Sequence, residues 1–210
     1  DLKTGKLTKV AEYQFGLGVA AHSKDHNKLL LGTGYTVGDG VLCLWEKGKQ
    51  KTLFGKLLED RAEGESVPLN GLGSAVFSPS EKGALVVSSV FEDTYSLGYL
   101  DFSKPAELEP VQLKGVKHKG VGELMEAAHL RKDRYLLLFN IDGCSWVYEG
   151  TFNEKKRQMT ITQVLVGAKP LDNGMLERVH YDSNDDLFTF SFSTATSPTQ
   201  LYTVGGKKRN

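Results

Sequence analysis

The sequence predicts an all-β fold, because it consists of short apolar runs and shows almost no helical pattern. Apolar residues at positions i, i+3, i+4 and i+7, which an amphipathic helix needs, are scarce. Runs rich in Val, Leu, Phe and Tyr recur instead between clusters of Gly, Asp, Asn, Ser and Pro, as in strands joined by turns. The 210 residues are enough for one large all-β domain with its own hydrophobic core.

The apolar runs repeat in pairs along the chain. The first members of the four pairs lie at residues 29–32, 84–89, 134–139 and 187–192. Their partners lie at residues 41–45, 96–102, 144–150 and 199–204. Successive first members start about 50 to 55 residues apart, which is close to the spacing of kelch-type propeller blades. Each first run also follows a short semi-apolar strand and a polar turn.

Each repeat therefore predicts a meander of strands, as in a propeller blade. Outer fourth strands are expected at residues 49–54, 110–113 and 160–166. One such unit cannot cover both of its faces, so blades stack radially and bury apolar side chains between neighbours. The predicted fold is thus a β-propeller with at least four blades, each a four-stranded antiparallel meander, and part of a larger propeller.

The same alignment predicts the limits of the repeats. They are expected at about residues 14–66, 67–118, 119–170 and 171–210, after the end of an earlier blade at residues 1–13. The last repeat stops after its third strand. We therefore expect missing flanking blades rather than closure of a four-bladed ring.

Charge and cysteine content exclude several classes of partner and site. Lys and Arg number 26 and so do Asp and Glu, so the net charge is zero and predicts binding neither to nucleic acid nor to an anionic membrane. Cys43 and Cys144 have no metal-ligand spacing, and their strands belong to blades too far apart for a disulfide. We expect both thiols to be reduced.

The sequence also favours a soluble, cytoplasmic protein. No stretch approaches the roughly 18 uninterrupted apolar residues of a membrane helix. The first ten residues show no charged head followed by an apolar block, as a signal peptide would. Reduced cysteines favour the same compartment.

Two stretches carry a resemblance to a known family. In residues 136–152, Asn140, Asp142 and Gly143 lead into a strand with Trp146 and Tyr148. In residues 185–204, a strand runs into a Ser/Thr-rich connection, Pro198 and Tyr202. Both stretches resemble late blades of the N-terminal β-propeller domain in the prolyl oligopeptidase family of serine peptidases, such as acylaminoacyl peptidases and dipeptidyl peptidases. The turn FSPSEKG at 77–83 resembles the usual Ser-Pro-Asp-Gly turn, with Ser80 and Glu81 in place of Asp and Gly.

The resemblance implies a non-catalytic gate. In that family the propeller sits over an α/β-hydrolase domain and restricts which peptides enter, so the implied partners are such a domain and a peptide substrate. The alternative is a stand-alone propeller of the TolB type, which shares these turns and acts as a protein-binding scaffold.

The sequence assigns no catalytic, cofactor-binding or metal-binding residue. A serine peptidase of this kind needs a G-x-S-x-G turn with an Asp and a His. The segments GCSWV (143–147) and GESVP (64–68) share only the first Gly and the Ser. The hydroxyl-rich run at 191–199 is interpreted as a turn between strands, with Ser and Thr bonding to the backbone.

Other polar clusters are also interpreted as structural. His22, Asp25 and His26 look like metal ligands, but their spacing is expected to bring two imidazoles together only on a helix, and a turn is predicted here. His129 and His180 recur at the ends of the short semi-apolar strands that precede the first runs. This recurrence indicates a repeated packing environment.

The remaining charged and aromatic residues are assigned in the same way. The basic segments at 114–120 and 207–210 are expected to be solvated loops, because no aromatic residues are interleaved. Glu123 and Glu126 are expected to be exposed, or else to line the propeller mouth and meet a peptide amine. The aromatic residues expected to pack between blades are Trp45, Tyr99, Tyr148 and Tyr202.

Overall fold

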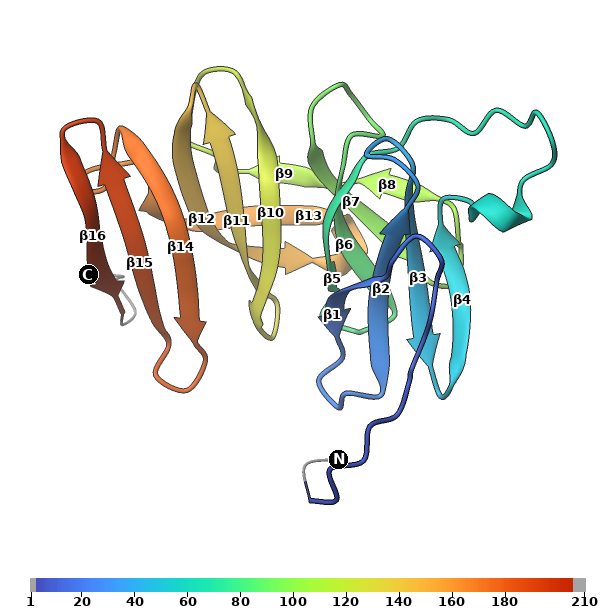
Figure 1. Ribbon diagram of the computed structural model, residues 1–210. Coiled ribbons are helices and arrows are strands. Elements are labelled where there is room, and N and C mark those ends of the chain that lie inside the picture. Colours follow the sequence, from blue (N-terminus) through green and yellow to red (C-terminus); the bar gives the residue numbers. More distant parts are fainter. Residues whose placement is uncertain (1–2, 206–210) are drawn as a thin grey trace.

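The computed structural model describes residues 3–205, which form sixteen strands and two short 3-10 helices (Figure 1). The first eight strands are β1 (Gly18–His22), β2 (Lys28–Gly34), β3 (Gly40–Glu46), β4 (Lys49–Phe54), β5 (Leu72–Phe77), β6 (Gly83–Ser88), β7 (Ser96–Asp101) and β8 (Leu108–Pro110). The others are β9 (Gln112–Lys114), β10 (Gly122–Arg131), β11 (Arg134–Ile141), β12 (Cys144–Asn153), β13 (Gln158–Val166), β14 (Gly174–Asp182), β15 (Leu187–Thr194) and β16 (Ser197–Val204). The helices are η1 (Leu58–Asp60) and η2 (Glu154–Lys156).

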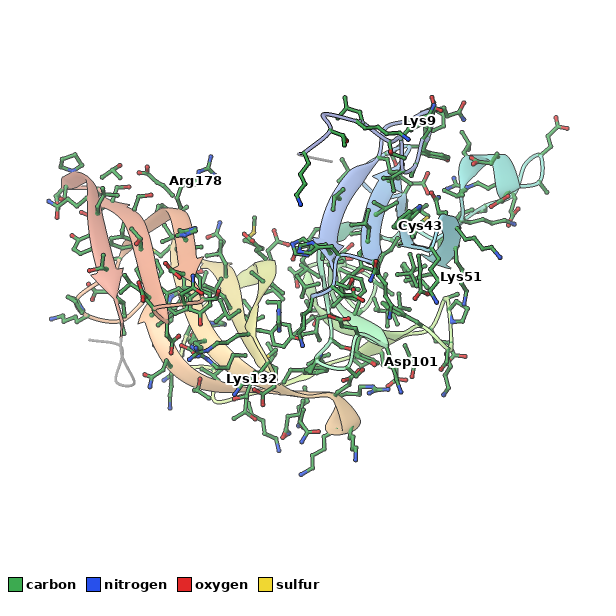
Figure 2. All side chains as sticks on the ribbon, turned by 90° about the horizontal axis from the view of Figure 1, so that it is seen from below. Lys9, Cys43, Lys51, Asp101, Lys132 and Arg178 are labelled. Carbon is green, nitrogen blue, oxygen red and sulfur yellow. The ribbon has the colours of Figure 1, made fainter. Side chains whose placement is uncertain are left out.

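The strands form four sheets that follow one another along the chain. Their strand orders are β1-β2-β3-β4, β5-β6-β7-β8, β10-β11-β12-β13-β9 and β14-β15-β16. Seen along the vertical axis of Figure 1, the sheets are arranged as an arc (Figure 2). Strand β5 contacts both β1 and β10, so the first strands of the blades lie innermost. The predicted all-β propeller with four blades is confirmed.

The turns between first and second strands share one backbone feature. Each contains a non-glycine residue in the left-handed region: His26 (φ 58°), Glu81 (54°), Lys132 (55°) and Asp186 (54°). A residue in this region lets the chain reverse within a few positions and return antiparallel. The repeat in the sequence is therefore also a repeat of backbone conformation.

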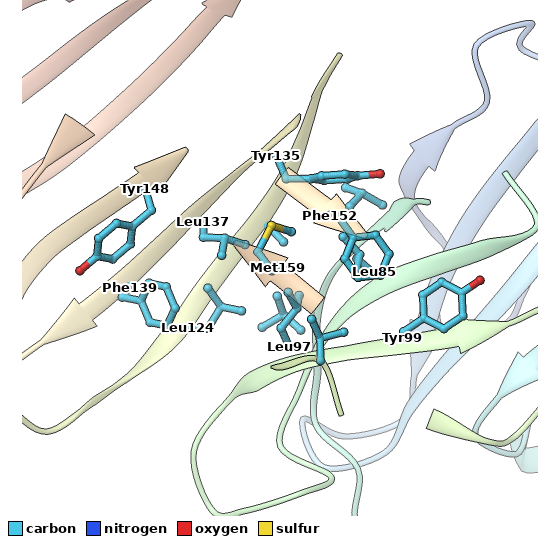
Figure 3. Close-up of a cluster of buried hydrophobic side chains, with 14 of the residues drawn as sticks. Leu85, Leu97, Tyr99, Leu124, Tyr135, Leu137, Phe139, Tyr148, Phe152 and Met159 are labelled. Atoms are coloured by element: carbon cyan, nitrogen blue, oxygen red, sulfur yellow. The ribbon is translucent and has the colours of Figure 1, made fainter. Parts of the chain in front are cut away.

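Apolar side chains fill the space between neighbouring sheets. The largest cluster joins the second and third sheets, where Leu85, Leu97 and Tyr99 pack with Tyr135 and Leu137 (Figure 3). Smaller clusters join the first sheet to the second and the third to the fourth. Each fully buried side chain of this size stabilises the fold by about 1.5–3 kcal/mol. The core is thus divided among the seams between blades.

The four aromatic residues predicted to pack between blades are all at least half-buried. Tyr99 and Tyr148 are buried in the cluster between the second and third sheets, and Tyr202 packs against the cluster between the third and fourth. Trp45 differs, because it packs on the open face of the first sheet beside Cys43.

The connection between the second and third sheets differs from the outer strand predicted at 110–113. Strand β8 pairs with β7 in the second sheet, whereas β9 pairs in parallel with β13 in the third. Val111, between them, is buried in the core cluster that joins the two sheets. With Val111 anchored in this way, residues 108–114 cross from the outer edge of the second sheet to the edge of the third.

The opening segment also differs from expectation. Residues 3–17 form no strand, so this part of the chain does not supply the blade end predicted at 1–13. Ala11 and Leu17 pack instead against the apolar cluster that contains Cys43. The segment therefore lies across the open face of the first sheet, where apolar contacts hold it, and does not follow a strand edge.

Both cysteines are free thiols, as expected. Cys43 is buried and Cys144 half-buried, in the first and third sheets respectively. Over residues 3–205, no helix has the length and apolar character needed to span a membrane.

Candidate functional site

A cavity of about 320 Å³ lies between the inner strands of the first three blades. We call it the axial cavity. Strands β1, β5 and β10 supply most of its wall, and small side chains are frequent there. They are Ala20, Ala21, Ser74, Ala75, Ala127 and Ala128. Because these side chains are short, three strands converge and still leave an open space.

Each inner strand carries a β-bulge or a related irregularity in its pairing. The shifts in register lie at Ala20 in β1, between Leu72 and Ala75 in β5, at Met125 in β10 and at Glu177 in β14. A bulge bends a strand, strengthens its twist and redirects a side chain. The irregularities thus recur in the strands that surround the axis, and Ala20 at the first of them lines the axial cavity.

Hydrogen bonds across the seams fix the wall of the axial cavity. The Lys24 N–H donates to Glu81 Oε1 at 2.9 Å and joins the first blade to the second. The Ala127 N–H donates to Ser74 Oγ at 2.8 Å and joins the third blade to the second. The cavity is therefore preformed, because its three walls are tied to one another.

Two of the three histidines on the inner strands, His22 and His129, occupy equivalent places. His22 lies opposite Leu29, His129 opposite Tyr135, and His180 opposite Thr189 on the paired second strands. Two of them, His22 and His129, line the axial cavity. The recurrence predicted for His129 and His180 is wrong. His129 lies opposite Tyr135, which faces the preceding blade, whereas His180 lies opposite Thr189, on the other face of its sheet from Phe188 and Phe190.

The tautomers of the two cavity histidines follow from their carbonyl partners. His22 Nδ1 lies 3.0 Å from the Ser23 carbonyl oxygen, and His129 Nε2 lies 2.9 Å from that of Lys132. A carbonyl only accepts, so these two nitrogens carry the protons in the neutral rings. His22 Nε2 and His129 Nδ1 then carry the lone pairs.

The segment of His22, Asp25 and His26 forms a turn, as predicted, but its imidazoles do meet. The two rings stack with centroids 4.3 Å apart. The expectation that only a helix would bring them together is wrong, because the left-handed His26 folds the turn back onto β1. Asp25 accepts hydrogen bonds from Ser23 and Asn27, which lower the pKa of its carboxyl. Among residues 3–205, no group of three or more His, Cys, Asp or Glu is placed to bind a metal ion.

The two glutamates considered for the propeller mouth are separated in the structure. Glu126 is exposed and lines the axial cavity. Glu123 lies in a different recess, where its carboxylate accepts the N–H of Tyr95 at 3.1 Å. The alternation of strand residues and the bulge at Met125 account for the separation.

A polar cluster around Glu154 was missed by the sequence analysis. Its carboxylate accepts the hydroxyls of Ser78 (2.7 Å), Ser80 (2.7 Å) and Tyr99 (2.8 Å) across the seam between the second and third blades. Burial favours the neutral acid, but these hydrogen bonds outweigh it and lower the pKa of Glu154. One sequence signal could have indicated this cluster: the turn at 77–83 lacks the usual Asp. Glu154, from the next blade, supplies the carboxylate that bonds to this turn instead.

The described residues present no activated serine. In the axial cavity, Ser74 Oγ accepts a backbone N–H, and Ser78 Oγ donates to Glu154. The hydroxyl-rich run contains a turn, but a shorter one than predicted, because only residues 195 and 196 lie between the strands. Ser191, Ser193 and Thr194 belong to β15, and Ser197 and Thr199 belong to β16. Over residues 3–205, none of these hydroxyls is hydrogen-bonded to a histidine, as a serine nucleophile would require.

The basic segment at 114–120 is not wholly solvated. The N–H groups of Lys117 and His118 donate to the Tyr148 hydroxyl, so this part of the segment packs on the third blade. The other basic segment, at 207–210, lies outside the described residues.

Comparison with solved structures identifies the fold. TolB from Acinetobacter baumannii superposes with a TM-score of 0.58 at 13% identity, over 93% of this chain and 42% of that one. Oligopeptidase B from Trypanosoma brucei gives 0.61 at 14% identity, over 90% of this chain and 25% of the other. Prolyl oligopeptidase B from Galerina marginata gives 0.60 at 10% identity, over 88% and 23%.

These similarities establish a propeller fold shared with TolB and with prolyl oligopeptidases. The chain spans less than half the length of each of these three proteins. No protein-family model matches the sequence, and no curated protein is significantly similar to it.

Proposed function

We propose that this chain is the non-catalytic propeller of a prolyl oligopeptidase-like serine peptidase and gates the access of peptides to a hydrolase domain outside this chain. The observation that carries the proposal is the axial cavity, with its small side chains and preformed wall. Its volume, about 320 Å³, is at the lower end of the range for ligand pockets. A space of this size accommodates a few residues of an extended peptide and excludes a folded protein.

The charged groups of the axial cavity suit a peptide. Glu126 supplies a carboxylate for a peptide amine, and Lys24 supplies a cation for a peptide carboxylate. His22 and His129 add nitrogen acceptors for peptide N–H groups. The residues that line the axial cavity include no activated nucleophile. We therefore assign hydrolysis to a partner domain and the selection of peptides by size to this chain.

The structural neighbours support this proposal over a generic propeller. The Galerina marginata neighbour is bound to a 25-residue macrocyclization substrate, and the Trypanosoma brucei neighbour holds covalently bound antipain. We further propose a cytoplasmic location, because both cysteines are free thiols.

The alternative is a scaffold of the TolB type that binds another protein. It is favoured by the TolB neighbour, which superposes over 93% of this chain. The reading frame of the parent gene separates the two proposals. A downstream G-x-S-x-G with a later Asp and His supports the gate, and a stop codon soon after Asn210 supports the scaffold.

The gate is tested in the full-length parent enzyme with Ala20→Trp, which places an indole in the axial cavity. The ratio of kcat/KM for a long peptide to that for a chromogenic dipeptide should fall about tenfold, because the longer substrate meets the narrowed passage. Val19→Trp is the matched control, because Val19 is 64% exposed on the same strand and does not line the cavity. An unchanged ratio in Ala20→Trp would reject gating through this cavity.

A further inference from the structure

Large apolar side chains are exposed along one rim of the propeller. This rim consists of the turns between second and third strands and the connections between blades, and it is the upper edge in Figure 1. We call it the upper rim. Its exposed apolar residues are Tyr35 (60%), Val37 (87%), Leu69 (83%), Val90 (38%), Val121 (79%) and Met175 (43%). They lie in turns of the first two blades, in the connections that precede the second and third blades, and at the start of β14 in the fourth. Apolar residues so distributed on one side are typical of an interaction surface.

The opposite rim has a different character. It consists of the turns between first and second strands and between third and fourth strands, and charged residues such as Lys24, Lys82 and Asp133 are exposed there. In the described part of the chain, none of the large exposed apolar side chains belongs to these turns. The two rims therefore differ, because large exposed apolar side chains occur on the upper rim and not in the turns of the opposite rim.

An acidic recess interrupts the apolar surface of the upper rim. It has a volume of about 430 Å³, and Asp93, Glu123 and Asp142 line it together with Val121. Asp142 accepts the Val121 N–H at 3.2 Å, and Glu123 accepts a backbone N–H. Within residues 3–205, no Lys, Arg or His forms an ion pair with any of these three carboxylates within 4.0 Å. The recess thus concentrates negative charge that a partner can neutralise.

We propose that the upper rim is the docking surface for a partner protein that presents apolar side chains and at least one Lys or Arg that enters the acidic recess. The inference rests on the proposed function only in that the chain acts through a partner. Apolar anchors supply affinity, and the charge pair fixes orientation.

The surface is tested with two amphipathic peptides of equal length, one of Leu and Lys and the other of Leu and Glu. Their binding to the chain is followed by fluorescence anisotropy. The Leu/Lys peptide should bind, and V37S/L69S/V121S and D93N/D142N should each weaken its binding at least about tenfold. The control V10S/L201S removes apolar side chains that are 46% and 78% exposed elsewhere, and it should leave the affinity unchanged.

Hydrogen exchange provides a readout that does not depend on variants. The Leu/Lys peptide should protect backbone amides at residues 35–38, 90–94 and 119–122 of the wild-type protein. Equal binding of the Leu/Glu peptide, unchanged binding in V37S/L69S/V121S, or a wild-type dimer that this triple variant dissociates would each overturn the proposal.

The outcomes separate this proposal from the gate. D93N/D142N should leave the size selection of the parent enzyme unchanged, because neither Asp93 nor Asp142 lines the axial cavity. If Ala20→Trp changes its size selection while V37S/L69S/V121S and D93N/D142N still bind the Leu/Lys peptide normally, the gate is supported and the docking surface is rejected. If Ala20→Trp keeps its size selection while the rim variants bind the Leu/Lys peptide more weakly, only the gate is rejected.

Discussion

The Tyr148 hydroxyl oxygen lies 2.9 Å from Nδ1 of His118 and also accepts the backbone N–H groups of Lys117 (3.3 Å) and His118 (3.0 Å). Both lone pairs of the phenol oxygen are thereby engaged, so the hydroxyl proton points to His118 Nδ1. His118 is then neutral with its proton on Nε2. Protonation of Nδ1 would place its N–H against the O–H of Tyr148, so that two donors face each other. This would weaken the attachment of the segment 114–120 to the third blade.

We expect acid to destabilise the protein through His118. Burial lowers the pKa of this imidazole below its ordinary value of 6.5. A depressed folded pKa means that the unfolded chain takes up the proton first, so the stabilisation is complete above pH about 6.5 and is lost as the pH falls toward the folded pKa. Urea unfolding from pH 7.5 to 5 should show this decline. In His118→Gln the decline should be smaller, and equal pH profiles for the two proteins would contradict the assignment.

Removing the Tyr148 hydroxyl should destabilise the third blade. Tyr148→Phe leaves two backbone N–H groups and one imidazole nitrogen without their partner in a half-buried place, which costs about 1–3 kcal/mol in the free energy of unfolding. Tyr202→Phe is the matched control, because the Tyr202 hydroxyl donates to the exposed Gln200 and not to a buried group among residues 3–205. Chemical denaturation measures both, and equal stability in the two variants would disprove the role of the Tyr148 hydroxyl.

The repeat and most buried positions could be predicted because they depend on local pattern. The runs at 84–89 and 134–139 alternate and cluster as strands do, and burial follows from that pattern. The axial cavity also had a signal that was not used: Ala-Ala-His occurs at 20–22 and again at 127–129, and both copies line the cavity.

Long-range polar contacts could not be predicted in this way. Glu154 meets Ser78 and Ser80 across more than seventy positions of sequence, and no local periodicity indicates such a pair. The same holds for the exposed apolar side chains of the upper rim, since Val37 and Val121 come onto one rim only after the blades stack.

Glu154 should be a major stabilising group of the second seam. Glu154→Ala removes the shared acceptor of three hydroxyls, so we expect a loss of about 2–4 kcal/mol in the free energy of unfolding. Lys155→Ala, at the exposed neighbouring position, should change it by less than about 0.5 kcal/mol. Thermal or urea unfolding of the two variants provides the comparison, and similar losses in both would refute the assignment.

The same carboxylate predicts a second pH effect, in a lower range. Hydrogen bonds keep the pKa of Glu154 below its ordinary value of 4.5. Its stabilisation is therefore complete above pH about 4.5 and is lost as the pH falls through the lowered pKa. Wild-type protein should lose stability between pH 4.5 and 3 more steeply than Glu154→Gln, whose side chain does not titrate. Parallel curves would show that Glu154 does not titrate differently in the folded state.

The ion pair of Arg134 and Glu149 should show that a buried carboxylate depends on its counter-ion. Glu149 is only 5% exposed, and burial raises its pKa even though Arg134 opposes the shift. Arg134→Met leaves this buried carboxylate without the guanidinium and also removes a bond of 2.9 Å to Asp186 in the fourth blade. We expect a loss of about 3–5 kcal/mol at pH 8. At pH 5 the loss should be smaller, because Glu149 can then take up a proton.

The double variant Arg134→Met/Glu149→Gln should recover part of the loss, since no buried charge remains at position 149. A double-mutant cycle by urea unfolding measures this coupling. Additive losses at both pH values would show that the two side chains do not act as a pair.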